Sequence, residues 1–211
     1  MIVVTMDIEA TGLLEDPKAR PVEIGAVRHN LHTGEILNTF ESFCRPSNDL
    51  LDEAKFSLCK RISGIDREQI LGAPCFKQVV RDFIHWVGDS LIYTWNLSYD
   101  QRMLSRYLRD WQPSADLPVP RMDPVDTLGV LYKDYGNDWS EELRWGGCWR
   151  QLYTYMHPDR AGQSVSGQLK TISLSRAILY EGMAEKQLHR ALSDADLAAR
   201  IGHVIYRKLQ D

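Results

Sequence analysis

The sequence contains no long hydrophobic run. Its longest apolar stretches, Met1–Met6 and Leu91–Trp95, fall far short of the roughly 20 residues that a helix needs to cross a bilayer. No basic segment precedes Ile2, so the start of the chain lacks the charged region of a secretory signal peptide. We therefore expect neither a membrane span nor a cleaved signal peptide.

Cysteine is scarce and scattered. A disulfide framework is typical of much smaller secreted chains, and a zinc site needs clustered ligands. No C-x-x-C pair occurs among the four cysteines, which are Cys44, Cys59, Cys75 and Cys148. We expect reduced thiols, several of them buried, in a cytoplasmic protein.

An excess of basic residues is also absent. The 25 Lys and Arg residues face 29 Asp and Glu residues, for a net charge of −4. This balance argues against a protein that coats duplex nucleic acid through a broad basic face, but not against an enzyme that holds a few nucleotides in a local cleft. With 211 residues, 44% of them hydrophobic, and no internal repeat, we predict a single domain over residues 1–211.

The first half of the chain alternates between strand and helix patterns. Ile2–Ile8 is a short β-branched apolar run, typical of a strand buried on both faces. Val22–His29 and Glu35–Cys44 flank a turn-rich spacer, which predicts an antiparallel hairpin and, with the first strand, a three-stranded meander. An apolar stripe at helical spacing then predicts a helix from Phe76 to Val87, followed by a buried strand at Leu91–Trp95.

The second half is less regular. A helix capped by Ser98 is expected after that strand. Residues 134–168 are rich in aromatic residues and glycine without a clear period, so we interpret them as a loop-rich elaboration of the same domain. A final apolar stripe between Leu197 and Leu209 predicts a helix with Ser193 as its cap.

Acidic residues occupy the ends of these elements. Asp7 and Glu9 close the first strand two residues apart, so their side chains point to one face, and no Lys or Arg lies within residues 1–13. Asp100 follows another apolar strand, and Asp194 starts the final helix, where the helix dipole favours an anion. Taken singly, these acids also fit a solvated strand end or a helix cap.

Convergence of the four acids would require cations. Two like charges about 4 Å apart repel by about 4 kcal/mol at an effective dielectric near 20. An all-oxygen ligand set selects Mg²⁺ or Mn²⁺ over zinc, and two such ions suit phosphodiester hydrolysis. His189 precedes Asp194 by five residues, on the loop before the predicted helix. An imidazole there is suited to take a proton from water near pH 7, although a lone loop histidine is usually only solvated.

Three segments resemble the motifs of the DEDDh 3′–5′ exonucleases. They fall in the family's order, span nearly the whole chain, and are Asp7-Ile8-Glu9-Ala10-Thr11-Gly12, Asn96-Leu97-Ser98-Tyr99-Asp100 and His189-Arg190-Ala191-Leu192-Ser193-Asp194. The resemblance implies an α/β, ribonuclease H-like fold, in which a mixed five-stranded sheet of antiparallel meander and parallel strands has flanking helices. Residues 62–65 and the helix after them resemble the Eri-type exoribonuclease branch.

The resemblance also implies a role for each acidic residue. Asp7 would bridge two metal ions, and Glu9 and Asp194 would hold the ion at which water attacks. Asp100 would support the second ion, and His189 would be the general base.

The expected substrate-binding residues come from the first two motifs and are Ala10, Thr11, Gly12, Leu13, Asn96 and Tyr99. Within this set Leu13 would lie against the base of the terminal nucleotide. The family commonly has Thr where Ala10 stands and a small residue where Leu97 stands. Neither position is a metal ligand, so these departures concern the shape of the pocket.

The resemblance implies an exonuclease that uses two Mg²⁺ or Mn²⁺ ions to release nucleoside monophosphates from the 3′ ends of single-stranded DNA or RNA. A haloacid-dehalogenase-type phosphatase is an alternative, because residues 7–11 superficially match D-x-D-x-T. That chemistry needs Asp where Glu9 stands and gives His189 no role. A catalytically idle binding module on the same fold is a second alternative.

Other properties stay open at this point. Tryptophans such as Trp139, Trp145 and Trp149 could stack on bases or belong to the core. Arg102, Arg106 and Arg109 share one helix face and could hold phosphates or be solvated. The sequence does not decide between DNA and RNA, nor does it reveal processivity, pathway or oligomeric state, and a homodimer stays open.

Overall fold

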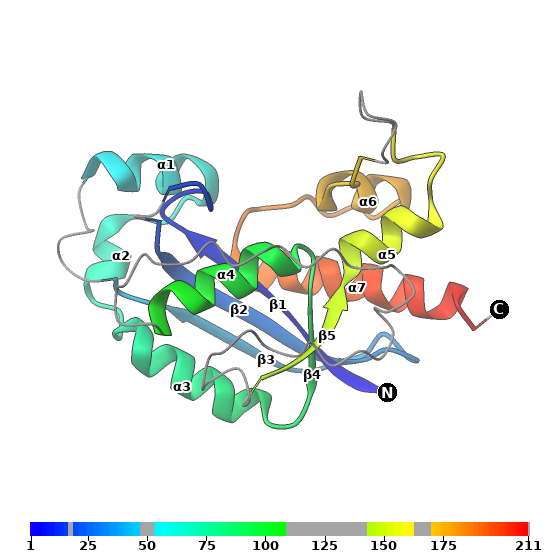
Figure 1. Ribbon diagram of the computed structural model, residues 1–211, viewed down its shortest axis with the longest axis horizontal. Helices are drawn as coiled ribbons and strands as arrows, with labels where there is room; N and C mark the ends of the chain where they lie inside the picture. The colour runs from blue at the N-terminus through cyan, green and yellow to red at the C-terminus, as the bar shows by residue number, and fades with distance from the viewer. Residues whose placement is uncertain (17–18, 47–52, 109–142, 163–169, 211) are drawn as a thin grey trace.

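A mixed five-stranded sheet forms the centre of the molecule (Figure 1). The computed structural model describes residues 1–16, 19–46, 53–108, 143–162 and 170–210. The strands are β1 (Ile2–Ala10), β2 (Pro21–Asn30), β3 (Ile36–Phe43), β4 (Leu91–Thr94) and β5 (Arg144–Cys148). Their order in the sheet is β3-β2-β1-β4-β5. The first three strands are antiparallel neighbours, whereas β4 runs parallel to β1 and β5 runs parallel to β4. The predicted meander and mixed sheet are therefore confirmed.

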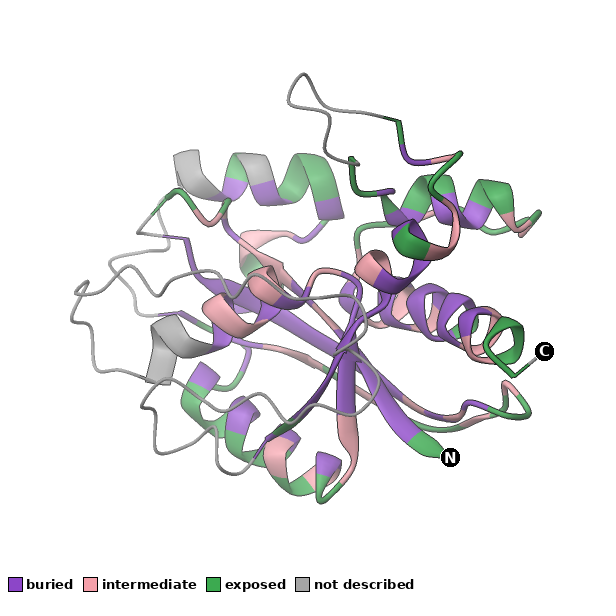
Figure 2. Cartoon of the chain, turned by 45° about the vertical axis from the view of Figure 1, so that its right-hand side comes forward, coloured by how far each residue is buried: buried purple, intermediate pink, exposed green. Residues whose placement is uncertain are grey.

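Helices cover both faces of the sheet. The described helices are α1 (Glu53–Ser63), α2 (Arg67–Leu71), α3 (Phe76–Val87), α4 (Leu97–Leu108), α5 (Trp149–Met156), α6 (Leu174–Tyr180) and α7 (Ala191–Lys208). Helices α3 and α4 pack with Val4 and Met6 of β1, whereas α5, α6 and α7 pack with Val3 on the opposite face. Burial is extensive along β1, β2 and β4 and on the inner side of α7, whereas no residue of β3 is fully buried (Figure 2). No helix within the described ranges is long and apolar enough to cross a membrane.

The alternation of β1 explains where its acids point. Val4, Met6 and Ile8 belong to the core under α3 and α4. Because successive side chains of a strand point to opposite faces, Asp7 and Glu9 lie on the same face as Val3, toward α7. The sequence pattern of the first strand thus determines that its acids meet the last helix.

Two helix boundaries differ from the sequence prediction. Helix α4 begins at Leu97, so Ser98 lies inside its first turn. Helix α7 begins at Ala191 and its cap position is Arg190, so the prediction of Ser193 as the cap is wrong. The physical reason is that the first amide of α7 is bonded by a distant strand: the Ala191 N–H donates to a Glu23 carboxylate oxygen at 3.0 Å. A local pattern search cannot detect such a partner.

The loop-rich interpretation of residues 134–168 is wrong for the part that contains β5 and α5. Two glycines in this strand gave it a turn-like composition, yet one of them has a packing role. A Cβ at Gly146 would lie 2.4 Å from the ring of Tyr93 in the neighbouring strand. Glycine is therefore required for close packing here, not for a turn.

Three described tryptophans belong to the core. Trp95, Trp145 and Trp149 are all buried, and Trp149 stacks on Tyr93 with ring centroids 4.1 Å apart. Trp139 and Arg109, together with the side chain of Arg106, lie outside the described residues. The core alternative therefore holds for these three tryptophans, and the fourth described one, Trp86, is half-buried against the core under α3 and α4.

A buried polar chain links α5 to the sheet. The indole Nε1 of Trp149 donates to Thr5 Oγ1 at 3.0 Å, and Thr5 Oγ1 lies 2.9 Å from His29 Nε2. The Thr5 hydroxyl can accept from the indole and donate its own proton to an unprotonated Nε2. Burial lowers the pKa of His29 from 6.5 to about 4, and nearby His203 acts in the same direction. This series of hydrogen bonds therefore fits a neutral His29.

Candidate active site

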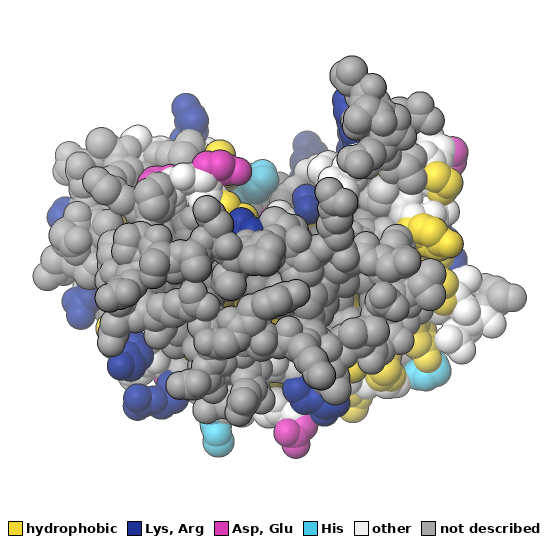
Figure 3. Space-filling model, in the orientation of Figure 1, with side chains coloured by type: hydrophobic (Ala, Val, Ile, Leu, Met, Phe, Trp, Pro, Cys, Tyr) yellow, Lys and Arg dark blue, Asp and Glu magenta, His cyan; other side chains and the backbone are white. Residues whose placement is uncertain are grey.

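The five residues singled out as ligands and base line one cavity of about 430 Å³. Asp7 and Glu9 come from the end of β1, Asp100 from the first turn of α4, and Asp194 from the first turn of α7, while His189 lies on the loop before α7. In the space-filling view, acidic, histidine and basic side chains gather at the upper edge of the molecule, between the regions of α1 and α6 (Figure 3). The convergence that the sequence could only suggest is present.

Strand register sets the positions around the two acids of β1. Asp7 pairs across β1 and β2 with Gly25, and Glu9 pairs with Glu23. A Cβ at Gly25 would lie 2.0 Å from the backbone nitrogen of Leu192 and 2.2 Å from the carbonyl carbon of Ala191. The missing side chain thus lets the first turn of α7 approach the sheet beside Asp7.

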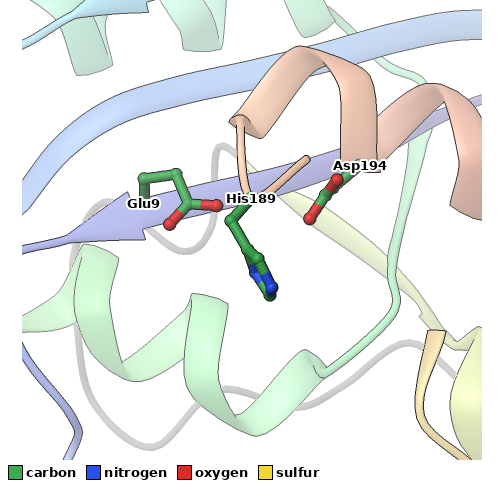
Figure 4. Close-up of side chains that lie close together, drawn as sticks. All are labelled: Glu9, His189 and Asp194. Atoms are coloured by element: carbon green, nitrogen blue, oxygen red, sulfur yellow. The ribbon is translucent and has the colours of Figure 1, made fainter. Parts of the chain in front are cut away.

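Asp194 is held by the loop that precedes α7. The Gln187 side-chain amide donates to Asp194 Oδ2 at 2.8 Å, and the Leu188 N–H donates to Asp194 Oδ1 at 3.3 Å. One ligand atom from each of Glu9, His189 and Asp194 can be chosen so that all three lie within 4.8 Å of one another. Figure 4 shows these side chains approaching a common space from β1, the loop and α7.

Asp100 is a buried acid of the cavity, and one of its carboxylate oxygens has no hydrogen-bond partner among the described residues. Its exposed fraction is 1%, and this oxygen is its Oδ1 atom. A buried, unpaired carboxylate oxygen is costly unless a cation or a donor occupies the space beside it. This atom therefore indicates that the cavity is built to hold a cation.

Burial raises the pKa values of all four acids, and repulsion by neighbouring acids adds to the effect at Asp7 and Glu9. The pKa of Asp7 is well above its usual value, because the group is desolvated and Asp100, Glu9 and Asp194 repel its charge. Burial first, then Asp194, raises the pKa of Glu9 to about 9. Burial likewise raises the pKa of Asp100 to about 8, despite the opposing effect of Arg150, and raises the pKa of Asp194. Each shift reports a carboxylate that is poorly stabilised by the protein alone.

The donor set fits hard divalent cations. Four carboxylates supply only oxygen, and the one nitrogen donor, His189, is exposed. Oxygen-rich sites of this kind suit Mg²⁺ or Mn²⁺. Cations in this cavity would also relieve the repulsion that contributes to the raised pKa values of Asp7 and Glu9.

Most of the predicted substrate-binding residues border the same cavity, and one does not. The residues that line it are Ala10, Gly12, Leu13, Asn96 and Tyr99. The Tyr99 hydroxyl donates to the Gly12 carbonyl at 3.2 Å, which ties the second motif to the first. Thr11 does not line the cavity. Its Oγ1 accepts a bond from the Arg20 N–H at 3.0 Å, so the hydroxyl supports the turn instead.

Sequence reasoning missed three further residues at the site. Arg150 lines the cavity from α5 and donates through Nη2 to Asn96 Oδ1 at 2.7 Å. It was missed because its helix was not recognised. Gln187 holds Asp194, and its position two residues before His189 was the only available signal. Glu23 gave no signal at all, because nothing local to its strand shows what it contacts.

The chain matches a known protein family. The model of the RNase T exonuclease family covers residues 4–146. This range contains Asp7, Glu9 and Asp100 but ends before His189 and Asp194. This match to an exonuclease family leaves the phosphatase alternative without support.

Curated relatives include the PolC-type DNA polymerase III of several bacteria. The protein of Clostridium perfringens is 24% identical over 208 residues, which are 99% of this chain and 11% of that polymerase. The Bacillus subtilis protein is 28% identical over 134 residues, or 64% of this chain and 9% of that polymerase. The chain therefore spans about a tenth of the length of these relatives.

Solved structures share the fold. The nuclease domain of 3′hExo, a DEDDh family member bound to rAMP, aligns with a TM-score of 0.66 at 20% identity, over 100% of this chain and 92% of that chain. E. coli Exonuclease I in complex with a dA16 oligonucleotide aligns with a TM-score of 0.62 at 16% identity, over 100% of this chain and 41% of that chain. The expected ribonuclease H-like fold is thus confirmed.

Proposed function

Because the chain belongs to the RNase T exonuclease family, we propose that it is a 3′–5′ exonuclease that removes nucleotides from single-stranded DNA or RNA. The observation that carries the proposal is the meeting of four carboxylates and one imidazole in a single cavity. The products would be nucleoside monophosphates. Among the similar structures, Exonuclease I was solved with a dA16 oligonucleotide and the 3′hExo nuclease domain with rAMP, which supports a single-stranded substrate and a mononucleotide product.

Two divalent cations, Mg²⁺ or Mn²⁺, are proposed as cofactors. Asp7, Glu9 and Asp194 would hold one ion, and Asp7 with Asp100 would hold the other. When bound, such ions supply positive charge to the reacting phosphate and lower the pKa of water. The raised pKa values of the four acids and the unpaired Oδ1 of Asp100 support this assignment.

His189 would serve as the general base. Its side chain is exposed at the mouth of the cavity and can lie within 4.8 Å of carboxylate oxygens of Glu9 and Asp194. From this position the imidazole would accept the proton of the attacking water and pass it to solvent.

Other residues that line the cavity would bind the terminal nucleotide. Leu13 is 63% exposed at the cavity edge, which makes its side chain available for contact with a base. Arg150 presents a cation to the same cavity, near Asp100, where a phosphate oxygen would need charge compensation. The bond that Arg150 donates to Asn96 would hold the guanidinium in place.

A direct test uses 5′-labelled DNA and RNA oligomers, single-stranded and double-stranded, with Mg²⁺ or Mn²⁺. A ladder that shortens stepwise from the 3′ end, and that disappears with chelator, is expected. Asp7→Asn should abolish the ladder with the fold unchanged by circular dichroism, whereas Asp82→Asn, at an exposed position on α3, should not. A fully active Asp7→Asn variant would refute the metal assignment.

A second variant tests the base. His189→Ala should lower turnover by roughly 10²–10⁴-fold while Mn²⁺ binding, measured by calorimetry, is mostly retained. If the same variant loses metal binding, His189 is a ligand instead of a base.

A further inference from the structure

Glu23 is a fifth carboxylate beside the site. It lies on β2 directly opposite Glu9, and its exposed fraction is 0%. It does not line the cavity. Its charge raises the pKa of both Asp7 and Glu9, so it makes the local repulsion worse. A buried acid in this position needs a specific partner.

Arg190 supplies that partner. Its Nε lies 3.1 Å from both carboxylate oxygens of Glu23, and its Nη2 lies 2.6 Å from Oε1. The same guanidinium lies 3.7 Å from Glu41 and over the ring of Phe43, both on β3. A guanidinium fixed through two nitrogens has a defined orientation, which a single-point ion pair does not give.

Glu23 also caps the N-terminus of α7 through its side chain. The cap residue, Arg190, makes no side-chain cap bond of its own. Glu23 Oε2 accepts the N–H of Ala191, the first residue of the helix, at 3.0 Å. Both oxygens of Glu23 are therefore committed to Arg190 and to α7, which removes Glu23 from the set of available metal ligands.

Hydrogen bonds of the residues before and after His189 hold both sides of this loop position. His189 has a φ of 53°, the one positive value at a non-glycine residue among those described. This left-handed region is disfavoured for a side chain, so the conformation persists only if neighbouring contacts impose it. On one side, Gln187 and the Leu188 N–H bind Asp194. On the other side, Arg190 binds Glu23.

We propose that the Glu23–Arg190 pair is a positioning device that holds His189 in its left-handed conformation over Glu9 and Asp194. The pair touches neither substrate nor metal and acts through His189. The inference rests on the proposed exonuclease function for its kinetic consequence, but the anchoring of the loop can be measured without activity.

The kinetic test uses Glu23→Gln, which keeps the size of the side chain but removes its charge. It should lower kcat by roughly 10–100-fold and change KM less than threefold, because displacing a catalytic group by about 1 Å can cost 10²-fold in rate. The matched control is Arg200→Gln on α7, which breaks one ion pair to Glu185, before the helix (2.7 Å), and one to Asp196, within it (2.8 Å). The control should keep wild-type kcat. Equal kcat in Glu23→Gln and the control would overturn the proposal.

A double-mutant cycle separates positioning from general destabilisation. If Glu23 acts through His189, adding Glu23→Gln to His189→Ala should lower kcat no further. A structural effect elsewhere would multiply the two losses. Full multiplication would therefore overturn the proposal.

Amide hydrogen exchange gives a readout that does not need activity. In Glu23→Gln, exchange over residues 187–192 should accelerate at least tenfold while exchange over residues 24–27 of β2 stays at the wild-type rate. Unchanged exchange over residues 187–192 would refute the anchoring. If the wild-type protein trims no 3′ ends but Glu23→Gln still shows the accelerated exchange, the proposed function fails and the positioning of His189 stands.

Discussion

Replacing Gly25 by alanine should separate α7 from the sheet at the active site. The new Cβ would lie 2.0 Å from the Leu192 nitrogen and 2.2 Å from the Ala191 carbonyl carbon. These are backbone atoms, so no rotamer change can relieve the contact. To reach an ordinary contact of 3.4 Å, the first turn of α7 and β2 must move apart by about 1.4 Å.

That displacement has two measurable consequences. Overpacking of this kind costs about 1–3 kcal/mol, and a rigid backbone contact belongs at the upper end. For a chain of this length, about 3 kcal/mol lowers Tm by about 6–12 °C. His189 and Asp194 are carried by the loop and the turn that move, so kcat should fall by roughly 10²-fold.

Thermal unfolding and end-labelled oligomer assays measure both effects. Gly72→Ala is the control, because a Cβ there meets no atom within 4 Å and its φ of −84° suits alanine. Assays at least 20 °C below the Tm of the variant keep the fraction unfolded small. If Gly25→Ala retains wild-type kcat and Tm, the close approach of α7 to β2 does not position the site.

Three further outcomes are expected. Mn²⁺ at about 100 times its Kd should stabilise the protein by about 2.7 kcal/mol, and Asp7→Asn should lose most of this shift in Tm. Arg150→Gln should raise KM for oligomers roughly tenfold or more, because it removes a charge-assisted bond of about 1.5–3 kcal/mol; an unchanged KM contradicts a role in phosphate binding. The lowered pKa of His29, about 4 against 6.5, means that the unfolded state binds the extra proton between these values, so stability should fall by up to about 3 kcal/mol as the pH drops from 6.5 to 4. Urea unfolding across this range should show the loss in the wild type and not in His29→Gln.

Periodicity and local motifs were sufficient for much of the architecture. Alternation and helical spacing predicted β1, the β2–β3 hairpin, α3 and the body of α7, because each buries a face along its own length. These buried faces are local features, so a single sequence expresses them. The meeting of Asp7, Asp100 and Asp194 is not local, and only the resemblance to the DEDDh motifs implied it before any geometry was known.

Other parts depend on distant neighbours. Gly146 in β5 looks like a turn residue until Tyr93 is placed against it. Glu23 has the sequence context of an ordinary strand residue, and only the fold shows that it accepts hydrogen bonds from Arg190. The cap of α7 comes from β2, so inspection of its flanking residues selected the wrong position.

The location of α7 late in the chain affects biosynthesis. Polypeptides emerge from the ribosome from the amino end, so the β1 acids and Asp100 appear before His189 and Asp194 exist. A nascent chain lacking α7 has only part of the ligand set and no base. In the proposed mechanism, translation must therefore pass residue 194 before the catalytic site can form.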